Sequence, residues 1–320
     1  MALPTSEIKL MNTKYYSKFL QYFFLMMFIA ITQNSLAAQG GKQQQDAKHV
    51  DLTLPKDWYL GEVTGLEFLP NGDLVVFNRG LHPLLIFSAT GQFKREIGLG
   101  LFAVPHGLFV DSQGSIWTTD QQTHQVLKLN PEGNIELILG RKDFKGLGWF
   151  ENGYQVNLFT SPSDVALDSK GNIYVADGGN FRIVKFDQYG KLVKAWGEKG
   201  ELPGQFNFPH SLYIDADDTL YVTDRQNARI QLFDTEGEFL KQWKDIGFPY
   251  EIERLNANSL VISDARSGEI NKIDFNGQVT ERLGKWGKRE SEFGFPHGLA
   301  VNHKGEIYVG ELLNWRVQKF

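Results

Sequence analysis

One pattern recurs six times along this chain, and the recurrence limits its fold more than any other feature of the sequence. Each copy holds two short apolar strands joined by a turn of Gly, Asn or Asp, and two further strands follow. The interval between copies is about 40 to 55 residues, which is typical of propeller blades. The copies begin at Val63, Pro105, Pro162, Pro209, Pro249 and Pro296. Four antiparallel strands form one blade, so the sequence predicts an all-β fold, a six-bladed β-propeller.

The two ends of the repeat region predict how the ring closes. The sixth copy stops at Phe320 after its third strand, which leaves blade six one strand short. The segment HVDLTLPKDWYLG, which begins at His49, is expected to pair as the outermost strand of that blade. Closure of this kind removes an exposed sheet edge. We therefore expect one propeller domain over residues 50–320.

The residues before the propeller have the pattern of a signal peptide. In residues 1–38, lysines precede the apolar run FLQYFFLMMFIAI and the small-residue stretch SLAAQG, with cleavage expected near Ala37 or Ala38. The run is shorter than the roughly 20 residues that span a bilayer, so no permanent membrane span is expected after cleavage. Residues 39–49 are rich in Gln and Gly and are expected to form a flexible lead-in. The sequence thus predicts an exported protein, periplasmic or secreted.

The composition is that of a globular chain, with 42% hydrophobic and 22% charged residues. The net charge of -5 comes from interspersed signs, without the basic stripe that follows a nucleic-acid backbone. Because the chain has no cysteine, it forms no disulfide and no thiolate metal site. We expect a monomer that binds no nucleic acid.

Histidine occupies one position of the repeat in every second blade. The residue after the leading proline, or its equivalent, reads Thr64, His106, Ser163, His210, Tyr250 and His297 around the ring. Alternate blades of six are related by approximate threefold rotation, so the three side chains can converge on one metal ion. Three neutral imidazoles with an open fourth position suit catalytic zinc, and copper, iron or cobalt would also accept them. The alternative is a variable loop position at which histidine merely packs or meets solvent.

Arginine recurs at a second position, directly after the acid that ends strand two. This position reads Arg79, Gln121, Gly178, Arg225, Ala265 and Leu312. The start of strand one and the end of strand two lie at the same end of a hairpin, so the two arginines are expected at the same mouth of the channel as the histidines. A guanidinium fork suits a carboxylate, and surface ion pairing is the alternative role. The repeated strand-two aspartates are expected to be structural.

The repeats resemble the NHL repeat in DGGNFRIVKF, DRQNARIQLF and ELLNWRVQKF. The segments FNRG, PHGL, HQVLKL, LILGR, FPHSL and FPHGL further resemble peptidyl-α-hydroxyglycine α-amidating lyase. This resemblance implies zinc on His106, His210 and His297, with Arg79 and Arg225 binding the substrate carboxylate. It also implies a zinc-dependent lyase that cleaves the N–Cα bond of a C-terminal α-hydroxyglycine, in a peptide or small molecule, to an amide and glyoxylate.

The sequence departs from the resembling family at two places. The family has a catalytic tyrosine in blade three, where this chain reads Gly178, Gly179 and Asn180 after its strand-two acid. Tyr154, in the long insertion between blades two and three, and Tyr250 are the candidates for a replacement base.

The second departure concerns calcium. Gly298 stands where the family has a calcium-binding aspartate, so that ligand is missing, while backbone oxygens of Leu66 and Leu108 would remain.

Two other functions stay open at this point. The first is a propeller without catalysis that binds peptides or small carboxylates at a metal-bearing channel mouth. The second is a metal-dependent hydrolase of the six-bladed lactonase kind, although those sites use Glu, Asn and Asp ligands rather than three imidazoles.

Overall fold

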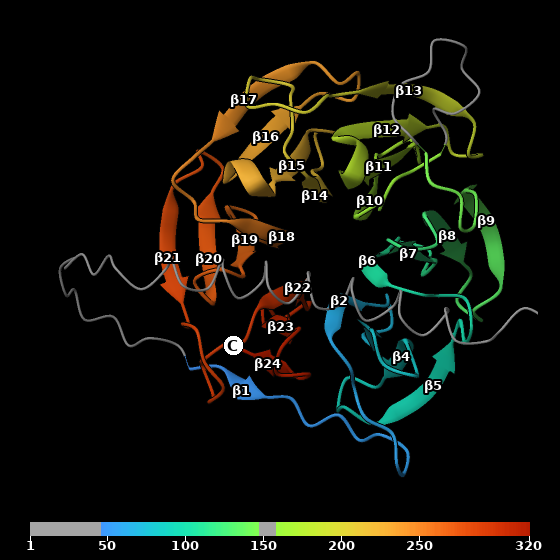
Figure 1. Cartoon of the computed structure of the whole chain (residues 1–320). Coiled ribbons are helices and arrows are strands. Elements are labelled where there is room, and N and C mark those ends of the chain that lie inside the picture. Colours follow the sequence, from blue (N-terminus) through green and yellow to red (C-terminus); the bar gives the residue numbers. More distant parts are fainter. Residues whose placement is uncertain (1–45, 147–157) are drawn as a thin grey trace, which may run out of the picture. The chain divides into compact units, whose positions relative to one another are not determined.

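A computed structural model describes residues 46–146 and 158–320 of the chain. Within these two ranges the chain forms twenty-four β-strands and two short 3-10 helices. The strands make six four-stranded antiparallel sheets arranged around a central axis (Figure 1). The prediction of a six-bladed β-propeller is therefore confirmed. No helix in these ranges is long and apolar enough to cross a membrane.

The first strand of each blade lies nearest the axis (Figure 1), and the others follow outward in chain order, except that the outermost strand of blade six is β1 from the N-terminal segment. In blades one to three these are β2 (Val63–Phe68), β3 (Leu74–Asn78), β4 (Leu84–Phe87), β5 (Phe93–Ile97), β6 (Pro105–Val110), β7 (Ile116–Asp120), β8 (Gln125–Leu129), β9 (Ile135–Gly140), β10 (Asp164–Leu167), β11 (Ile173–Asp177), β12 (Arg182–Phe186) and β13 (Leu192–Trp196).

Blades four to six repeat the arrangement. Their strands are β14 (Pro209–Ile214), β15 (Leu220–Asp224), β16 (Arg229–Phe233), β17 (Phe239–Trp243), β18 (Pro249–Asn256), β19 (Ser259–Asp264), β20 (Glu269–Asp274), β21 (Val279–Leu283), β22 (Pro296–Val301), β23 (Ile307–Glu311), β24 (Val317–Lys319) and β1 (Lys48–His49). The two 3-10 helices, η1 (Gly178–Asn180) and η2 (Arg225–Asn227), follow the second strands of blades three and four.

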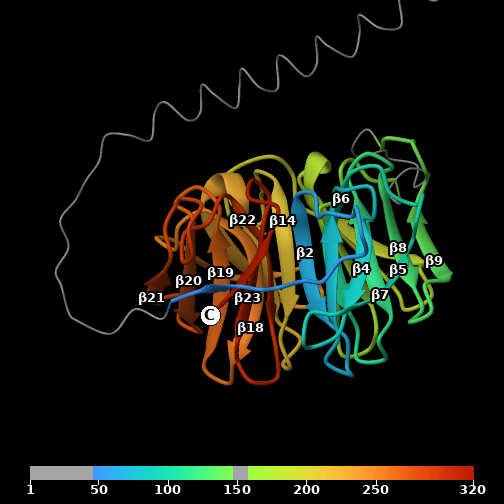
Figure 2. The same cartoon turned by 90° about the horizontal axis from the view of Figure 1, so that it is seen from below.

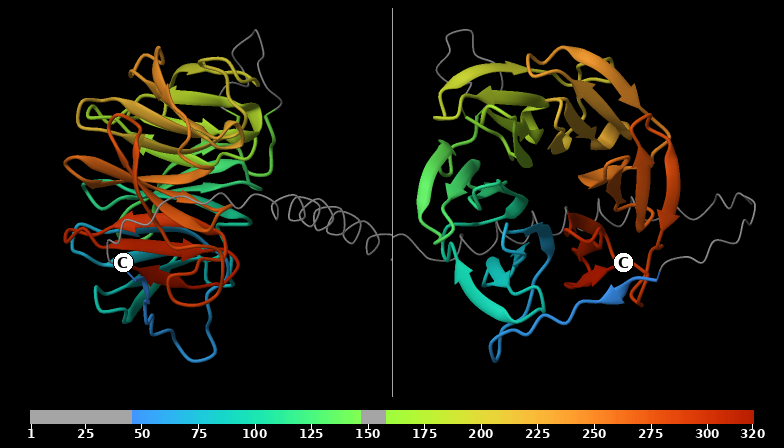
Figure 3. Two further views of the ribbon diagram at one scale, coloured as in Figure 1. Left: turned by 90° about the vertical axis from the view of Figure 1, so that its left-hand side faces the viewer. Right: turned by 180° about the vertical axis from the view of Figure 1, so that it is seen from behind.

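The ring closes through β1, which pairs antiparallel with β24 and brings His49 opposite Gln318. Figure 3 shows this blue strand beside the red end of the chain. Closure by the N-terminal segment is confirmed, but the closing strand is only two residues long and lies wholly within residues 39–49, which were expected to form a flexible lead-in. The rest of the expected strand continues toward blade one, where Thr53 bridges Gln92 in parallel. One N-terminal segment thus ties blade six to blade one.

The sheets of neighbouring blades face each other around the ring (Figure 1), and apolar side chains pack between them. Figure 2 shows the same blades from the side, with their strands running roughly parallel to one another. The inner strands are buried on both faces, so β3 and β4 read as continuous apolar runs rather than as alternating ones. Between blades one and two, for example, Phe77 packs with Leu108 and Ile116.

The acid that ends strand two is structural, as the sequence predicts. In three blades this acid is buried and forms an ion pair with the arginine that opens or precedes the third strand; the arginine is also buried in blades three and four and is partly exposed in blade six. These pairs are Asp177–Arg182 at 2.8 Å, Asp224–Arg229 at 2.8 Å and Glu311–Arg316 at 2.6 Å. The same acids accept backbone N–H groups from the loop that enters the blade, for example from Asn207 to Asp224 at 2.7 Å. They therefore fix the loops that meet at the channel mouth.

Candidate metal centre

The three histidines lie at the starts of β6, β14 and β22, on alternate blades. Their ring centroids form a nearly equilateral triangle, 4.7 Å from His106 to His210, 4.8 Å from His106 to His297 and 4.9 Å from His210 to His297. One ligand nitrogen of each lies within 4.8 Å of the other two, and all three side chains are buried. The approximate threefold arrangement argued from the repeat is present, and this set could hold a metal ion.

Each histidine is oriented by the backbone of the following odd-numbered blade. The Nδ1 atoms of His106, His210 and His297 donate to carbonyl oxygens, each at 2.8 Å. The accepting carbonyls belong to Ser163, Tyr250 and Thr64 respectively. A carbonyl can only accept, so the proton lies on Nδ1 and the lone pair lies on Nε2. Around the six blades, the position after the leading proline, or its equivalent, thus alternates between a histidine and a residue whose carbonyl oxygen orients that histidine.

The histidines are also kept neutral. Burial lowers the pKa of His297 to about 3, and the positive charge of Arg79 adds to this effect. Burial likewise holds the pKa values of His106 and His210 well below their ordinary range. The Nε2 atom of His210 is buried and has no hydrogen-bond partner among the described residues. Buried neutral imidazoles with free Nε2 atoms are the form that binds a transition metal, so the residues fit a resident metal ion.

Two threonines support the orienting carbonyls. Thr119 Oγ1 donates to the Ser163 carbonyl at 3.1 Å and accepts from the Gly107 N–H at 2.8 Å. In blade four, Thr223 Oγ1 donates to the Tyr250 carbonyl at 3.3 Å. Blade six has Gly310 at the equivalent position, so the Thr64 carbonyl lacks this hydroxyl. The repeat pattern alone did not indicate these supporting hydrogen bonds, because their acceptors are backbone carbonyl oxygens.

Arg79 is held against blade two. Its Nε donates to the carbonyl of Pro105 at 3.1 Å, next to the first histidine. Its Nη1 lies 3.1 Å from Glu62 Oε2, an ion pair in which both side chains are partly exposed. The guanidinium is therefore anchored on one side, and its charge reaches His106 and His297.

Arg225 is held by aromatic rings instead. Its guanidinium carbon lies 4.4 Å from the ring centroid of Phe208 and 5.1 Å from that of Tyr250. Its Nε is buried, and no residue in the described ranges forms a hydrogen bond with it. No carboxylate in the described part of the chain lies within ion-pair distance of Arg225, and the neighbouring Asp224 pairs with Arg229. The salt-bridge alternative raised by the sequence is thus not what the described residues show for Arg225.

Of the two tyrosine candidates, Tyr250 lies beside the histidines. Its ring centroid is 5.0 Å from that of His210 and 5.1 Å from that of Phe295, and the residue is 8% exposed. Burial raises the pKa of its phenol, which therefore stays protonated at neutral pH. That state suits a proton donor better than a base. Tyr154 lies outside the described residues.

The backbone is closely packed at both places where the sequence departs from the resembling family. A Cβ at Gly178 would lie 2.9 Å from the Phe208 ring, and one at Gly179 would lie 2.5 Å from Thr160, so neither position has room for a side chain. A Cβ at Gly298 would lie 2.9 Å from the Thr64 carbonyl oxygen.

Carboxylates instead lie farther along the innermost strands of blades one, three and five. They are Glu67, Asp164, Glu251 and Glu253. Their charges act on one another across blades that are not neighbours, which places them around the axis. Burial raises all four pKa values, that of Glu67 to about 8 and that of Asp164 to about 7.

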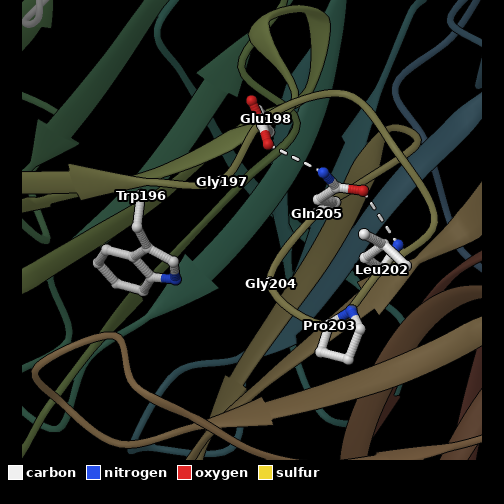
Figure 4. A pocket seen from close by; sticks show the side chains of 7 residues that line it. All are labelled: Trp196, Gly197, Glu198, Leu202, Pro203, Gly204 and Gln205. Atoms are coloured by element: carbon white, nitrogen blue, oxygen red, sulfur yellow. Dashed lines mark hydrogen bonds between the residues drawn. The ribbon is translucent and has the colours of Figure 1, made fainter.

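A surface hollow of about 430 Å³ lies elsewhere, beside the loop that joins blades three and four (Figure 4). It is lined by Trp196, Gly197, Glu198, Leu202, Pro203, Gly204 and Gln205. Gln205 bonds to Glu198 at 2.9 Å and to the Leu202 N–H at 3.1 Å within it. None of its residues belongs to the histidine centre, so it is not the candidate site.

Fold and site together define a six-bladed β-propeller with a buried three-histidine centre. A family model described as the NHL repeat matches residues 159–186 and 206–233. Solved propellers share the fold. A streptogramin B lyase superposes with a TM-score of 0.62 at 16% identity, over 87% of this chain and 99% of that one. A gluconolactonase from Xanthomonas campestris gives 0.59 at 16% identity, over 82% and 86%.

Among curated proteins, the chain is homologous over about half its length to amidating lyases. A probable peptidyl-α-hydroxyglycine α-amidating lyase of Caenorhabditis elegans is 33% identical over 47% of this chain and 48% of that protein. The peptidylglycine α-amidating monooxygenase of Rattus norvegicus is 35% identical over 45% of this chain. The chain spans 17% of the rat protein and 21% of a Xenopus laevis counterpart that is 31% identical.

Proposed function

We propose that this propeller is a zinc-dependent lyase that cleaves the N–Cα bond of a C-terminal α-hydroxyglycine. The products are a peptide amide and glyoxylate. The observation that carries the proposal is the buried, neutral histidine triad flanked by Arg79 and Arg225, in a chain homologous to proteins named as such lyases.

The reaction needs neither water nor an oxidant. The hydroxyl of α-hydroxyglycine loses its proton and becomes the aldehyde of glyoxylate, while the N–Cα electron pair passes to the amide nitrogen, which gains a proton. His106, His210 and His297 would hold the metal through their Nε2 atoms. A bound divalent metal lowers the pKa of an oxygen ligand such as the substrate hydroxyl.

The protein's own groups orient the substrate and move its protons. Arg79 and Arg225 bring two guanidinium groups to the mouth, where they bind the substrate carboxylate and stabilise charge as the bond breaks. Tyr250 carries a protonated phenol beside His210 and can donate to the leaving amide nitrogen. Burial of the triad keeps water away from the reacting atoms.

Measurement of bound metal and glyoxylate release tests the proposal. The mature chain is purified, its metal content is measured, and glyoxylate is followed with a simple N-acyl-α-hydroxyglycine. We expect about one zinc per chain in the wild type, loss of metal in His210→Ala, and metal with little turnover in Arg79→Ala. Tyr250→Phe is expected to lower the rate with metal retained. A chain without stoichiometric metal would contradict the proposal.

A second function is favoured by the crowding at Gly178 and Gly179, which leaves no place for the family tyrosine. In this function the propeller binds peptides or carboxylates at its metal and does not cleave them. Stoichiometric metal with no glyoxylate release would support it.

Export to the periplasm or the cell exterior is part of the proposal, and so is action as a monomer. The signal-peptide pattern of residues 1–38 lies outside the described residues. Secretion of a full-length fusion, compared with one that lacks residues 1–38, tests the export.

A further inference from the structure

Blade five departs from its neighbours at the channel mouth. In blades three, four and six, an arginine that opens or directly precedes the third strand pairs with the acid that ends strand two. In blade five the equivalent place at the start of β20 is Glu269, and Asp264 accepts backbone N–H groups of Phe248, Arg266 and Ser267 instead. Asp264 therefore shapes a turn that presents Arg266, without pairing with its guanidinium.

Arg266 has aromatic and amide contacts but no acid among the described residues. Its guanidinium carbon lies 3.6 Å from the ring centroid of Phe248. Its Nη2 donates to Gln226 Oε1 at 3.4 Å, which joins blade five to the residue after Arg225. The side chain is exposed at the mouth, so its charge is available to a ligand.

Arg225 and Arg266 are electrostatic neighbours. Burial lowers the pKa of Arg225, and the charge of Arg266 adds to the effect. Both charges also act on the phenol of Tyr250. Two guanidinium groups thus lie at the junction of blades four and five, and the described residues supply no carboxylate to either. A pair of like charges in this arrangement favours an anionic ligand.

We propose that Arg225 and Arg266 form an anion subsite for a second carboxylate of the substrate, so that the site prefers substrates with an acidic residue directly before the hydroxyglycine. This inference rests on the proposed function, in which Arg79 and Arg225, on opposite sides of the axis, bind the C-terminal carboxylate of the substrate. Arg225 would then lie between the two negative charges, and Arg266 would contact the second one alone. The ring of Phe208 holds the guanidinium group of Arg225 in place, and the ring of Phe248 holds that of Arg266.

Calorimetric binding of two unhydroxylated dipeptides tests the subsite without turnover. The ligands are N-acetyl-glutamyl-glycine and N-acetyl-glutaminyl-glycine, which share one carboxylate and differ in the second. We expect the acidic ligand to bind metal-loaded wild type about tenfold more tightly, which corresponds to one charge-assisted contact. The preference is expected to vanish in Arg266→Gln and to return in part in Arg266→Lys.

Arg254→Gln is the matched control. Arg254 belongs to the same blade and lies 5.7 Å from the Phe275 ring, but at the opposite end of β18 from the histidine mouth. The preference should persist in this variant. Equal affinities of the two ligands for the wild type would overturn the inference. So would an equal loss for both ligands in Arg266→Gln, because Arg266 would then bind the shared carboxylate.

Glyoxylate release is measured separately from the binding of the two dipeptides. If glyoxylate release fails while the Arg266-dependent preference holds, the subsite stands and the proposed reaction does not. If glyoxylate is released and the preference is absent, the reaction stands and the subsite does not.

Discussion

At the scale of single residues, the centre consists of side chains aimed by backbone atoms. His106 and His210 each donate to a carbonyl that also accepts a threonine hydroxyl, Thr119 or Thr223. Hydrogen bonds of this kind fix the tautomer and direction of an imidazole, and their loss weakens metal affinity.

Thr119→Val and Thr223→Val are therefore expected to lower zinc affinity, each by about tenfold, while the fold is retained. Competition with a chromogenic chelator measures the affinity. Thr118→Val is the control, because the Thr118 hydroxyl is buried and finds no hydrogen-bond partner in the part of the chain that the structure describes. Equal affinities in all three variants would show that the hydroxyls do not orient the centre.

Much of this site could be predicted from the sequence. Counting from the leading proline of each copy placed three histidines on one level, because the repeat preserves position within a blade. The carbonyls of Thr64 and Ser163 could not be predicted as acceptors, since any residue carries a carbonyl. Arg266 was missed because it lies one residue after the compared position, although the substitution of Glu269 for the third-strand arginine was a visible signal.

At the scale of elements, buried ion pairs fix the ends of the second strands. Arg229 is 2% exposed at its side chain, pairs with Asp224 and donates to carbonyls of the loop before blade four, including those of Leu202 and Gln205. That loop leads directly to His210.

Arg229→Met is expected to destabilise the protein by about 3 kcal/mol, because it leaves a buried carboxylate unpaired. The free energy of unfolding in urea measures the loss. Arg282→Met breaks an exposed pair with Glu269 and should cost at most about 1 kcal/mol. Similar losses in the two variants would contradict a special role for the buried pair.

The sequence predicted that an N-terminal strand closes the ring, but it did not predict how short this strand is. The repeat pattern predicted that blade six takes its outermost strand from the N-terminal segment, and the pairing of β1 with β24 confirms this. The length of the pairing depends on where the chain must turn to reach Gln92 in blade one, which only the packed ring determines.

At the scale of the whole molecule, the N-terminal segment stabilises the ring. Ala47 is fully buried between blades five and six, and its N–H donates to Ser291 at 2.8 Å. A chain that lacks residues 1–50 loses these contacts and exposes the edge of β24. We expect it to aggregate and to melt lower by roughly 6–12 °C, for a loss of about 3 kcal/mol. Deletion of residues 1–43 alone should leave Tm unchanged, as scanning calorimetry can verify.

The carboxylates around the axis, Glu67, Asp164, Glu251 and Glu253, predict how the free energy of unfolding depends on pH. The folded state holds a proton on Glu67 up to about pH 8, while the unfolded chain releases it near its ordinary value of 4.5. The folded state therefore binds more protons across this window, and the free energy of unfolding falls as pH rises from about 5 to 8.

Glu67→Gln should flatten this profile and raise Tm at pH 8 by roughly 2–4 °C for each kcal/mol recovered. Exposed Glu290→Gln is the control and should leave the slope as it is. A free energy of unfolding that rises between pH 5 and 8, measured in urea, would be incompatible with protonated axial carboxylates.

One hydrogen bond of the histidine centre joins blade six to blade one, where the ring closes. His297, in the last blade to be synthesised, donates to the carbonyl of Thr64, in the first. A nascent chain therefore has at most two aimed imidazoles until its C-terminus joins its N-terminus. If the centre holds metal as proposed, a chain that lacks blade six would keep only two of the three oriented imidazoles and should bind the metal more weakly than the full ring.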